Sequence, residues 1–453
     1  MFSKVLVANR GEIAVRVMRT CKRLGVKTVA IYSEADSEAV HVKKADESIM
    51  VGKSPPLESY LSIANICDAI GKVGADAVHP GYGFLSEFHQ FAEAVEKAGA
   101  TWVGPRPDVM AKVESKTYSR SRAREHGIPT IPGAYEPLRE PADLVKLLEE
   151  YGPVLIKPDA GGGGKGTRKL NDPSKAAEYL QAASRESKLY FGNGDVYAEK
   201  LLNRPRHVEV QILGGSDGKV IHLFERECSL QRRFQKVVEE TPSPALDEKQ
   251  RADLLGTAVE MARATGYTNA GTFEFLLEES SGNFYFLEIN KRLQVEHPVT
   301  EMTTGIDIVE QQIRIASGEG LLLEQDDVAH RGSSMEARVY AEDPRTFLPS
   351  PGTITGLHIP SGDGVRVDHA LEVGTKVPFY YDPLIAKLIT WGGSRREAID
   401  VMKDSLSKFV VQGVKTSIPL QRVIFNNQDF LAGKFDTTYL DQKLPELQAQ
   451  VKD

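Results

Sequence analysis

Two glutamates and an asparagine stand at strand positions where core residues are expected. Two aromatic-rich apolar runs are separated by the turn-forming segment 278–283, which predicts a β-hairpin. The first run contains Glu274, and the second contains Glu288, followed two residues later by Asn290. This spacing lets Glu288 and Asn290 point into one site, which Glu274 would join across the hairpin. Their hard oxygen ligands suit Mg²⁺ that is partly held by substrate phosphates.

The surroundings of these acids distinguish two interpretations. Side chains alternate along a strand, so Phe284, Phe286, Glu288 and Asn290 are expected to share one face. An edge hairpin with a solvated polar face is the usual setting of a lone strand glutamate. The neighbouring phenylalanines favour burial instead, and a buried unpaired carboxylate is costly unless it has a cation or a raised pKa.

A second candidate site is a glycine-rich loop between two expected strands. The strand at 153–158 contains Lys157, and four glycines follow at 161–164, with Lys165 after them. Backbone N–H groups of successive glycines can close on a phosphate, and lysine adds positive charge. The loop leads into an apparent strand at 167–170, whereas a dinucleotide-binding fingerprint opens a helix. A flexible surface turn is the alternative, but Lys157 favours a mobile phosphate-binding flap.

The elements that must position these residues begin with a parallel sheet. A strand at 5–8, a helix at 13–24 and a strand at 28–32 form a βαβ unit. Another strand, at 75–79, runs into the glycine-rich stretch 80–87, at the carboxyl edge where open α/β sheets bind ligands. An ordinary βα loop would explain that stretch about equally well.

Polar residues also recur between the glycine loop and the hairpin. The segment 206–212 alternates polar and apolar residues and predicts a half-buried strand, with His207 and Glu209 on its polar face. The charged stretches at 225–233 and 235–240 would, by themselves, usually be solvated faces. A third, mixed region begins near residue 335.

Composition bounds the class of protein. The chain has 453 residues, which favours two or three domains. A formal net charge of −7 argues against a general nucleic-acid binder. No apolar run approaches the ~18 residues of a membrane helix, and the first apolar run is too short for a signal peptide. Three widely spaced cysteines, Cys21, Cys67 and Cys228, suit the reducing cytoplasm.

The stretch from Glu288 to Glu301 resembles the signature of the biotin carboxylases, a family within the ATP-grasp superfamily. Closely similar stretches at 8–12, 80–87 and 225–240 extend the resemblance to essentially the whole chain.

The chain departs from the family pattern at a few positions. Most members have Thr or Pro where Lys291 stands, and Gly-Asp where Glu114 and Ser115 stand. The segment 158–160, Pro-Asp-Ala, replaces the usual small residues, and one glycine of the common run of five is missing.

The resemblance implies mixed α/β and α+β architecture built on an ATP-grasp fold. It implies an N-terminal Rossmann-like parallel-sheet domain at 1–113 and an ATP-grasp domain at 114–330. A mobile glycine-rich lid at about 133–203 belongs to the second domain, and a mixed C-terminal biotin carboxylase domain follows at 331–447.

The resemblance also implies site residues. Nucleotide binding falls to Lys116, Lys157, Gly162, Gly163, Gly164, Lys165, Gly166, Glu199, Lys200, Leu202, His207 and Gln231. Metal binding, to Mg²⁺ or Mn²⁺, falls to Glu274, Glu288 and Asn290. The residues implied to bind bicarbonate and biotin are Lys236, Arg292, Gln294, Val295, Arg338 and Tyr82. The implied catalytic residues are Glu296, Arg338, Arg292 and Lys236, with Glu296 as the base for bicarbonate and Arg338 beside the ureido oxygen of biotin.

The implied activity is carboxylation of biotin with ATP and bicarbonate, through carboxyphosphate. The chain's one Met-Lys pair, 402–403, lies in a helical pattern, so biotin is expected on a separate carrier protein. The other expected partners are a second copy of the chain and a carboxyltransferase subunit. The expected location is the cytoplasm, without nucleic acid or membrane.

Three functions fit these residues to different degrees. The first is the biotin carboxylase subunit of an acetyl- or propionyl-CoA carboxylase, with a split pyruvate carboxylase as the alternative parent complex. The second is another ATP-grasp ligase, such as a carboxylate–amine or carbamoyl-phosphate-type enzyme. The third is a catalytically idle structural partner, against which the acids and arginines of the implied site argue.

Overall fold

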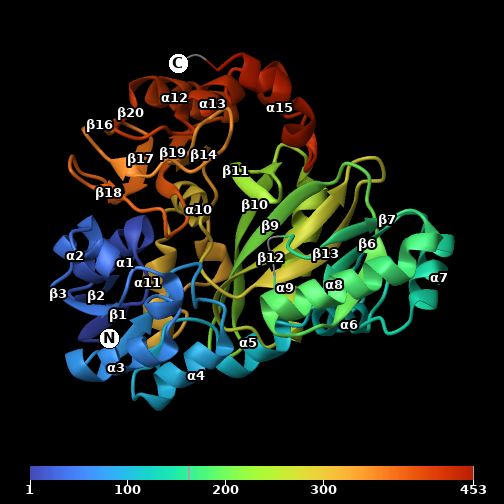
Figure 1. Ribbon diagram of the computed structural model, residues 1–453, viewed down its shortest axis with the longest axis horizontal. Helices are drawn as coiled ribbons and strands as arrows, with labels where there is room; N and C mark the ends of the chain where they lie inside the picture. Colours follow the sequence, from blue (N-terminus) through green and yellow to red (C-terminus); the bar gives the residue numbers. More distant parts are fainter. Residues whose placement is uncertain (162–163, 452–453) are drawn as a thin grey trace.

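A computed structural model describes residues 1–161 and 164–451. The chain begins with a five-stranded parallel sheet of order β3-β2-β1-β4-β5, shown in blue in Figure 1. Its strands are β1 (Lys4–Val7), β2 (Lys27–Ser33), β3 (Glu47–Gly52), β4 (Ala77–His79) and β5 (Thr101–Trp102). Its helices are α1 (Gly11–Arg23), α2 (Val40–Lys44), α3 (Ile63–Val73), α4 (His89–Lys97) and α5 (Pro107–Val113). The apolar run of β1 is buried on both faces, as in a parallel sheet covered by helices, and the expected βαβ unit is confirmed.

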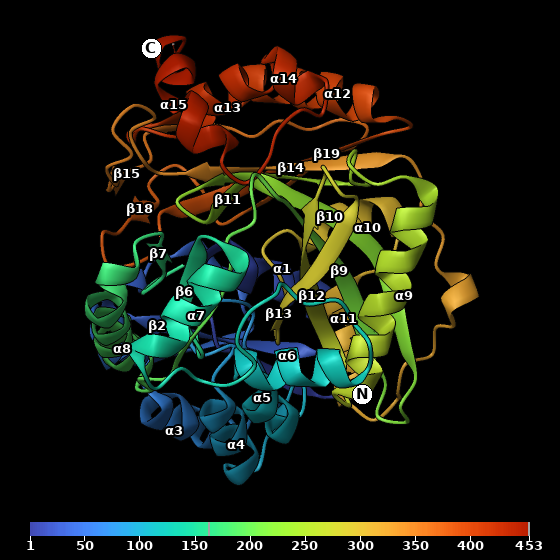
Figure 2. The ribbon, with the colours of Figure 1, turned by 90° about the vertical axis from the view of Figure 1, so that its right-hand side faces the viewer.

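A second sheet of eight strands forms the centre of the molecule, in the order β13-β12-β9-β10-β11-β14-β19-β17. Its strands are β9 (Arg206–Gly214), β10 (Val220–Arg232), β11 (Gln235–Thr241), β12 (Asn269–Glu278), β13 (Asn283–Asn290), β14 (Ser333–Tyr340), β17 (Val365–His369) and β19 (Leu384–Gly392). Because β11 pairs with β14, the sheet is continuous across the expected domain boundary at residue 330. The helices α6 (Lys116–Glu125), α9 (Glu248–Ala264), α10 (His297–Thr304) and α11 (Ile308–Ala316) pack around this sheet (Figure 2).

The glycine-rich loop belongs to a small separate layer, on the right in Figure 1. Strands β6 (Val154–Pro158), β7 (Arg168–Leu170) and β8 (Val196–Lys200) form a sheet of order β7-β6-β8, packed with α7 (Pro141–Tyr151) and α8 (Ala176–Phe191). The loop therefore joins two strands, as its sequence predicts. Two of its residues, Gly162 and Gly163, lie outside the described residues.

The C-terminal part caps the far end of the central sheet. Helices α12 (Arg395–Lys408), α13 (Ile418–Ile424), α14 (Gln428–Leu431) and α15 (Tyr439–Ala449) share one core with β14 and β19 (Figure 2). Short strands β15 (Gly352–Thr353), β16 (Gly356–His358), β18 (Lys376–Val377) and β20 (Val410–Gln412) complete it. The pair at 402–403 lies inside α12. Among residues 1–161 and 164–451, no helix combines the length and apolar character that crossing a membrane requires.

The hairpin of β12 and β13 forms as predicted, but its faces differ from the prediction. Glu274 pairs with Glu288, whereas Phe275 pairs with Phe286, so Leu287 is an extra residue in a β-bulge. The bulge interrupts the alternation, and Phe286 is packed in the core while Glu288 faces a cavity. The prediction that both share one face is therefore wrong.

Strand β9 is buried along its whole length, so the prediction of a half-buried strand is also wrong. Its apolar residues pack in a core with α9. Its polar residues contact other buried polar groups: Glu209 and Gln211 both bind Arg226, which also binds Thr300 of α10. The alternating pattern thus separates an apolar core from a buried polar network.

Candidate active site

A cavity of about 720 Å³ lies between the lid layer, the central sheet and the C-terminal part. Its lining includes seventeen of the residues that the resemblance implies: Lys116, Lys157, Gly164, Lys165, Glu199, Lys200, Leu202, His207, Gln231, Lys236, Glu274, Glu288, Asn290, Arg292, Gln294, Val295 and Arg338. These residues come from segments that are far apart in the sequence, and the fold brings them to one surface.

Three of the implied residues that the structure describes are not on this lining. Gly166 follows the lining residue Lys165, and Glu296 is buried beneath the cavity surface. Tyr82 lies to one side, where its hydroxyl contacts Glu12 and its ring lies 5.5 Å from Lys387 Nζ.

The acidic end of the cavity is formed by the bulged hairpin. Glu274 and Glu288 are direct cross-strand neighbours, and Asn290 follows on the same lining. Lys116 Nζ lies 3.4 Å from Glu288 Oε2. Glu274 lies beside two basic side chains, with Lys236 Nζ at 3.1 Å and His207 Nε2 at 3.0 Å. Burial alone would raise the pKa of Glu274, but Lys236 and His207 outweigh burial and lower it, so the carboxylate is ionised.

This end fits a divalent cation. The donors are carboxylate and amide oxygens, which Mg²⁺ and Mn²⁺ accept, and Glu274 is held ionised. The positive groups now nearest the two carboxylates, Lys116 and Lys236, mark the place where compensating charge is needed.

Lys236 is the hub of the buried charges. Its ammonium lies 2.5 Å from Glu209 Oε2 and 2.6 Å from Glu296 Oε1, in addition to its contact with Glu274. Burial would lower the pKa of Lys236, but the surrounding acidic groups raise it well above its ordinary value. Lys236 is therefore a fixed positive charge at the cavity wall.

Glu296 lies between two cations. Its Oε1 is bound by Lys236, and its Oε2 lies 3.0 Å from Arg338 Nη2. Burial would raise the pKa of Glu296, but Lys236, Arg338 and Arg226 hold it well below its usual range. The carboxylate is therefore ionised, and each of its two oxygens is held by a cation, Oε1 by Lys236 and Oε2 by Arg338.

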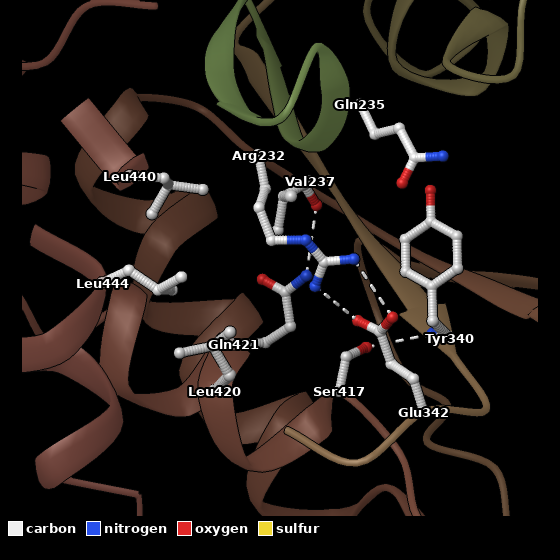
Figure 3. Close-up of a pocket in the computed structure, with 10 residues that line it drawn as sticks. All are labelled: Arg232, Gln235, Val237, Tyr340, Glu342, Ser417, Leu420, Gln421, Leu440 and Leu444. Atoms are coloured by element: carbon white, nitrogen blue, oxygen red, sulfur yellow. Dashed lines mark hydrogen bonds and ion pairs between the residues drawn. The ribbon is translucent and has the colours of Figure 1, made fainter. Parts of the chain in front are cut away.

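Arg338 is fixed by its side chain and by its backbone. Its guanidinium contacts Glu239 at 2.5 Å, and its carbonyl oxygen accepts hydrogen bonds from Gln421 Nε2 at 3.0 Å and Ser417 Oγ at 3.2 Å. Figure 3 shows a small pocket beside β14, the strand that carries Arg338, and in this pocket Arg232 pairs with Glu342. These contacts join the β10–β11 hairpin to the C-terminal helices, so Arg338 projects from a rigid support.

Arg292, Gln294 and Val295 follow β13 along the cavity. Arg292 Nη1 donates to Gln294 Oε1 at 2.6 Å, and its Nε lies 3.3 Å from Glu87 Oε2. The Val295 carbonyl accepts a hydrogen bond from the buried Lys387 at 2.8 Å. The cationic fork of Arg292 and the ammonium of Lys236 thus line the same cavity, an arrangement suited to a small planar anion.

A further part of the cavity wall adjoins the lid layer. Lys157 of β6 contacts Glu199 of β8, whose other oxygen accepts from Arg120 Nη1 at 3.1 Å. His207 and Gln231 are joined side by side, with Gln231 Nε2 2.6 Å from His207 Nδ1. This part of the wall combines Lys157, beside the glycine loop, with the polar His207 and Gln231 and the apolar Leu202.

Sequence reasoning missed the buried residues that support the site. Arg226 is fully buried and binds Glu209 at 2.6 Å, and Glu239 binds Arg338. Both lie in the charged stretches that are usually solvated. The available signal was alternation. Glu225, Arg226 and Glu227 follow one another in a strand, where successive side chains point to opposite faces of the sheet, so they cannot all lie on one solvated face.

Comparison with known proteins places these features in one family. Residues 1–110 match the family description "Biotin carboxylase, N-terminal domain", and 336–442 match "Biotin carboxylase C-terminal domain". Residues 115–324 match "Carbamoyl-phosphate synthase L chain, ATP binding domain".

Curated relatives and solved structures agree with these matches. The chain is 47% identical to a biotin carboxylase of Pseudomonas aeruginosa, over 98% of this chain and 99% of the relative. It is 45% identical to a pyruvate carboxylase subunit of Methanothermobacter thermautotrophicus, over 100% of this chain and 92% of the relative. The biotin carboxylase domain dimer of Hydrogenobacter thermophilus 2-oxoglutarate carboxylase, solved with MgADP, ADP and bicarbonate, superposes with a TM-score of 0.95. That structure is 47% identical and covers 99% of both chains. The chain therefore belongs to the biotin carboxylase family of ATP-dependent ligases.

Proposed function

We propose that this chain carboxylates biotin with ATP and bicarbonate, as the biotin carboxylase subunit of a multi-subunit acyl-CoA carboxylase. The observation that supports this best is the buried Glu296 carboxylate held between Lys236 and Arg338 at the cavity wall. It supplies one base and two cations at one point, which the activation of bicarbonate and the stabilisation of an oxyanion both need.

The nucleotide would lie between the lid layer and the hairpin. Lys116, Lys157, Lys165 and the glycine loop are proposed to hold its phosphates, with Glu199, Lys200, Leu202, His207 and Gln231 around its base and ribose. Glu274, Glu288 and Asn290 would hold Mg²⁺ or Mn²⁺, which supplies positive charge to the phosphate oxygens.

Bicarbonate would be held by Arg292 and Lys236, with the backbone near Gln294 and Val295. Glu296 is proposed to take the bicarbonate proton, and the bicarbonate oxygen then attacks the terminal phosphorus of ATP. The products of this half-reaction are carboxyphosphate and ADP. The role of the chain here is positioning together with charge complementarity, because phosphoryl transfer depends mainly on these two effects.

Biotin would be carboxylated in the second half-reaction. Carboxyphosphate releases CO2 and phosphate, the phosphate takes the ureido proton, and the ureido nitrogen bonds to CO2. Arg338 would stabilise the negative charge on the ureido oxygen. Tyr82 is the least well supported member of the proposed substrate set, because it lies off the cavity lining.

The activity is tested with free biotin as the acceptor. We expect ATP cleavage that requires bicarbonate and is stimulated by biotin, with carboxybiotin as a product. ATP cleavage that needs an amine instead would favour another ATP-grasp ligase. No turnover of ATP would favour a structural partner.

The parent complex is a further part of the proposal. Biotin would be presented by a separate carrier protein, and a separate carboxyltransferase would select the final acceptor. Pyruvate carboxylase is the second candidate, because the chain aligns over its full length with the pyruvate carboxylase subunit of Methanothermobacter thermautotrophicus. Identification of the carboxyltransferase that co-purifies with this chain distinguishes the two.

The proposed assembly and domain boundaries have separate support. A homodimer is supported by the related domain that was solved as a dimer. The boundaries at 113/114 and 330/331 fall in the intervals between the family matches. Sedimentation as a monomer at micromolar concentration would overturn the dimer.

A further inference from the structure

Lys291 lies in the middle of the site's sequence but points away from the cavity. It stands between Asn290 and Arg292, which both line the cavity, whereas Lys291 is 5% exposed and does not. Its ammonium donates to the Met110 carbonyl at 2.9 Å and to Glu114 Oε2 at 3.2 Å. The buried end of β13 is therefore tied to the junction of α5 and α6.

Glu114 is the residue through which this junction is held. It caps the C-terminus of α5, and the same oxygen that Lys291 contacts lies 3.1 Å from His89 Nδ1 of α4. Ser115 follows as the N-cap of α6, where its side chain accepts a hydrogen bond from Tyr118 N–H at 3.1 Å. The first residue of α6 is Lys116.

A second acid holds the same helix end from the lid layer. Asp159 is buried, and its Oδ1 accepts a hydrogen bond from the Thr117 N–H at 2.7 Å. Its carbonyl accepts from the Lys116 N–H at 2.9 Å. The first N–H groups of a helix have no partner within the helix, so a carboxylate at this position stabilises and orients the helix start.

We propose that Glu114, Lys291 and Asp159 are positioning residues that fix the start of α6, so that Lys116 faces the metal carboxylate Glu288. They connect the three segments that form the nucleotide end of the cavity: the lid strand β6, the start of α6 (Figure 2) and the end of β13. Glu114 and Lys291 contact each other, and Asp159 contacts the N–H groups of Lys116 and Thr117 at the same helix start.

The mechanical consequence concerns the distance between Lys116 and Glu288. Lys116 Nζ lies 3.4 Å from Glu288 Oε2, and each residue is at the end of an element held by this cluster. Removal of Glu114 leaves the buried Lys291 charge uncompensated, and removal of Lys291 or Asp159 breaks one of the contacts that hold the helix start, so the junction must shift or open to water. A shift of this kind separates groups that must act on the same phosphates.

The test is a double-mutant cycle on ATP binding, and it rests on the proposed contact of Lys116 with ATP. We expect Glu114→Gln and Lys291→Met each to raise KM for ATP by about tenfold, with kcat at saturating ATP within about threefold. The double variant should lose no more than the more affected single variant, because both remove the same contact. Asp159→Ala should also raise KM for ATP, because it removes the carboxylate that binds the Thr117 N–H at the start of α6.

Lys219→Met is the matched control. Lys219 also joins two distant segments by donating to one carbonyl, of Leu321, and one carboxylate, of Glu324, but it lies away from the cavity. Thermal unfolding of each variant separates a positioning effect from loss of folded protein. Unchanged KM for ATP in Glu114→Gln and Lys291→Met, or additive losses that follow the unfolding midpoint, would overturn the proposal. Lys116→Met tests the underlying assignment: an unchanged KM for ATP in that variant refutes the contact with ATP itself.

Discussion

Lys236 Nζ lies 2.6 Å from Glu296 Oε1, and both groups are almost completely removed from solvent. The pair joins β11 to Glu296, the residue that caps the start of α10 after β13, so one ionic contact connects two separate segments of the chain. Since the pKa of Glu296 is held down first by Lys236 against the effect of burial, the basicity of Glu296 depends on this contact.

Lys236→Met should therefore shift the pH profile of the bicarbonate-dependent ATPase. Loss of the ammonium removes the largest influence that lowers the pKa of Glu296, so that pKa rises. The acid limb of kcat/KM for bicarbonate should move to higher pH, and KM for bicarbonate should increase. Lys236→Arg, which keeps the positive charge, is the control. An acid limb at the same pH in Lys236→Met and in the wild type would show that Lys236 does not set the pKa of the base.

Glu288→Gln should abolish ATP turnover and weaken its dependence on Mg²⁺. The substitution keeps the shape of the side chain but removes one of two carboxylates at the proposed metal site. We expect a loss of at least about a hundredfold in kcat, the usual cost of removing a group that stabilises transition-state charge. Glu278→Gln, at the turn end of the same hairpin, should retain activity. Ordinary turnover by Glu288→Gln at ordinary Mg²⁺ would refute the assignment.

The structure also predicts acid sensitivity of the N-terminal sheet. Burial lowers the pKa of His79 from 6.5 to about 4, and His79 Nδ1 accepts a hydrogen bond from the Gly81 N–H. Between these two pH values the unfolded chain binds a proton that the folded chain does not, so stability falls as the pH decreases. At pH 5 the loss from this group is about 2 kcal/mol relative to pH 7.

Urea unfolding of His79→Gln measures this effect. The difference in unfolding free energy between pH 7 and pH 5 should be smaller in the variant by about the same amount. His358→Gln, at an exposed position on β16, should keep the wild-type difference. An equal difference in His79→Gln and wild type would show that His79 does not cause the acid sensitivity.

The hairpin and the glycine loop could be predicted because their signals are local. Alternation, turn residues and glycine runs depend on neighbours in sequence, and both elements form where they were expected. The bulge at Leu287 could not be predicted, since one extra strand residue leaves the composition unchanged yet moves Glu288 from the core face to the cavity.

The buried polar network was beyond prediction for a different reason. Whether Glu209 or Arg226 is solvated depends on the elements that cover them, and Arg226 is bound by Thr272 of β12 and Thr300 of α10, which are distant in the sequence. The contact between Glu114 and Lys291 likewise joins residues 177 positions apart, so only the fold could show that these two side chains meet.

We infer that Glu296 and Arg338 serve different half-reactions, and parallel assays of ADP release and carboxybiotin formation distinguish their roles. Glu296→Ala should lose both activities, because carboxyphosphate does not form. Arg338→Gln should lose carboxybiotin formation by a hundredfold or more, equivalent to ~2.7–4 kcal/mol, and keep appreciable bicarbonate-dependent ADP release. Equal losses of both activities in Arg338→Gln would show that this arginine serves the cleavage of ATP and not the second half-reaction.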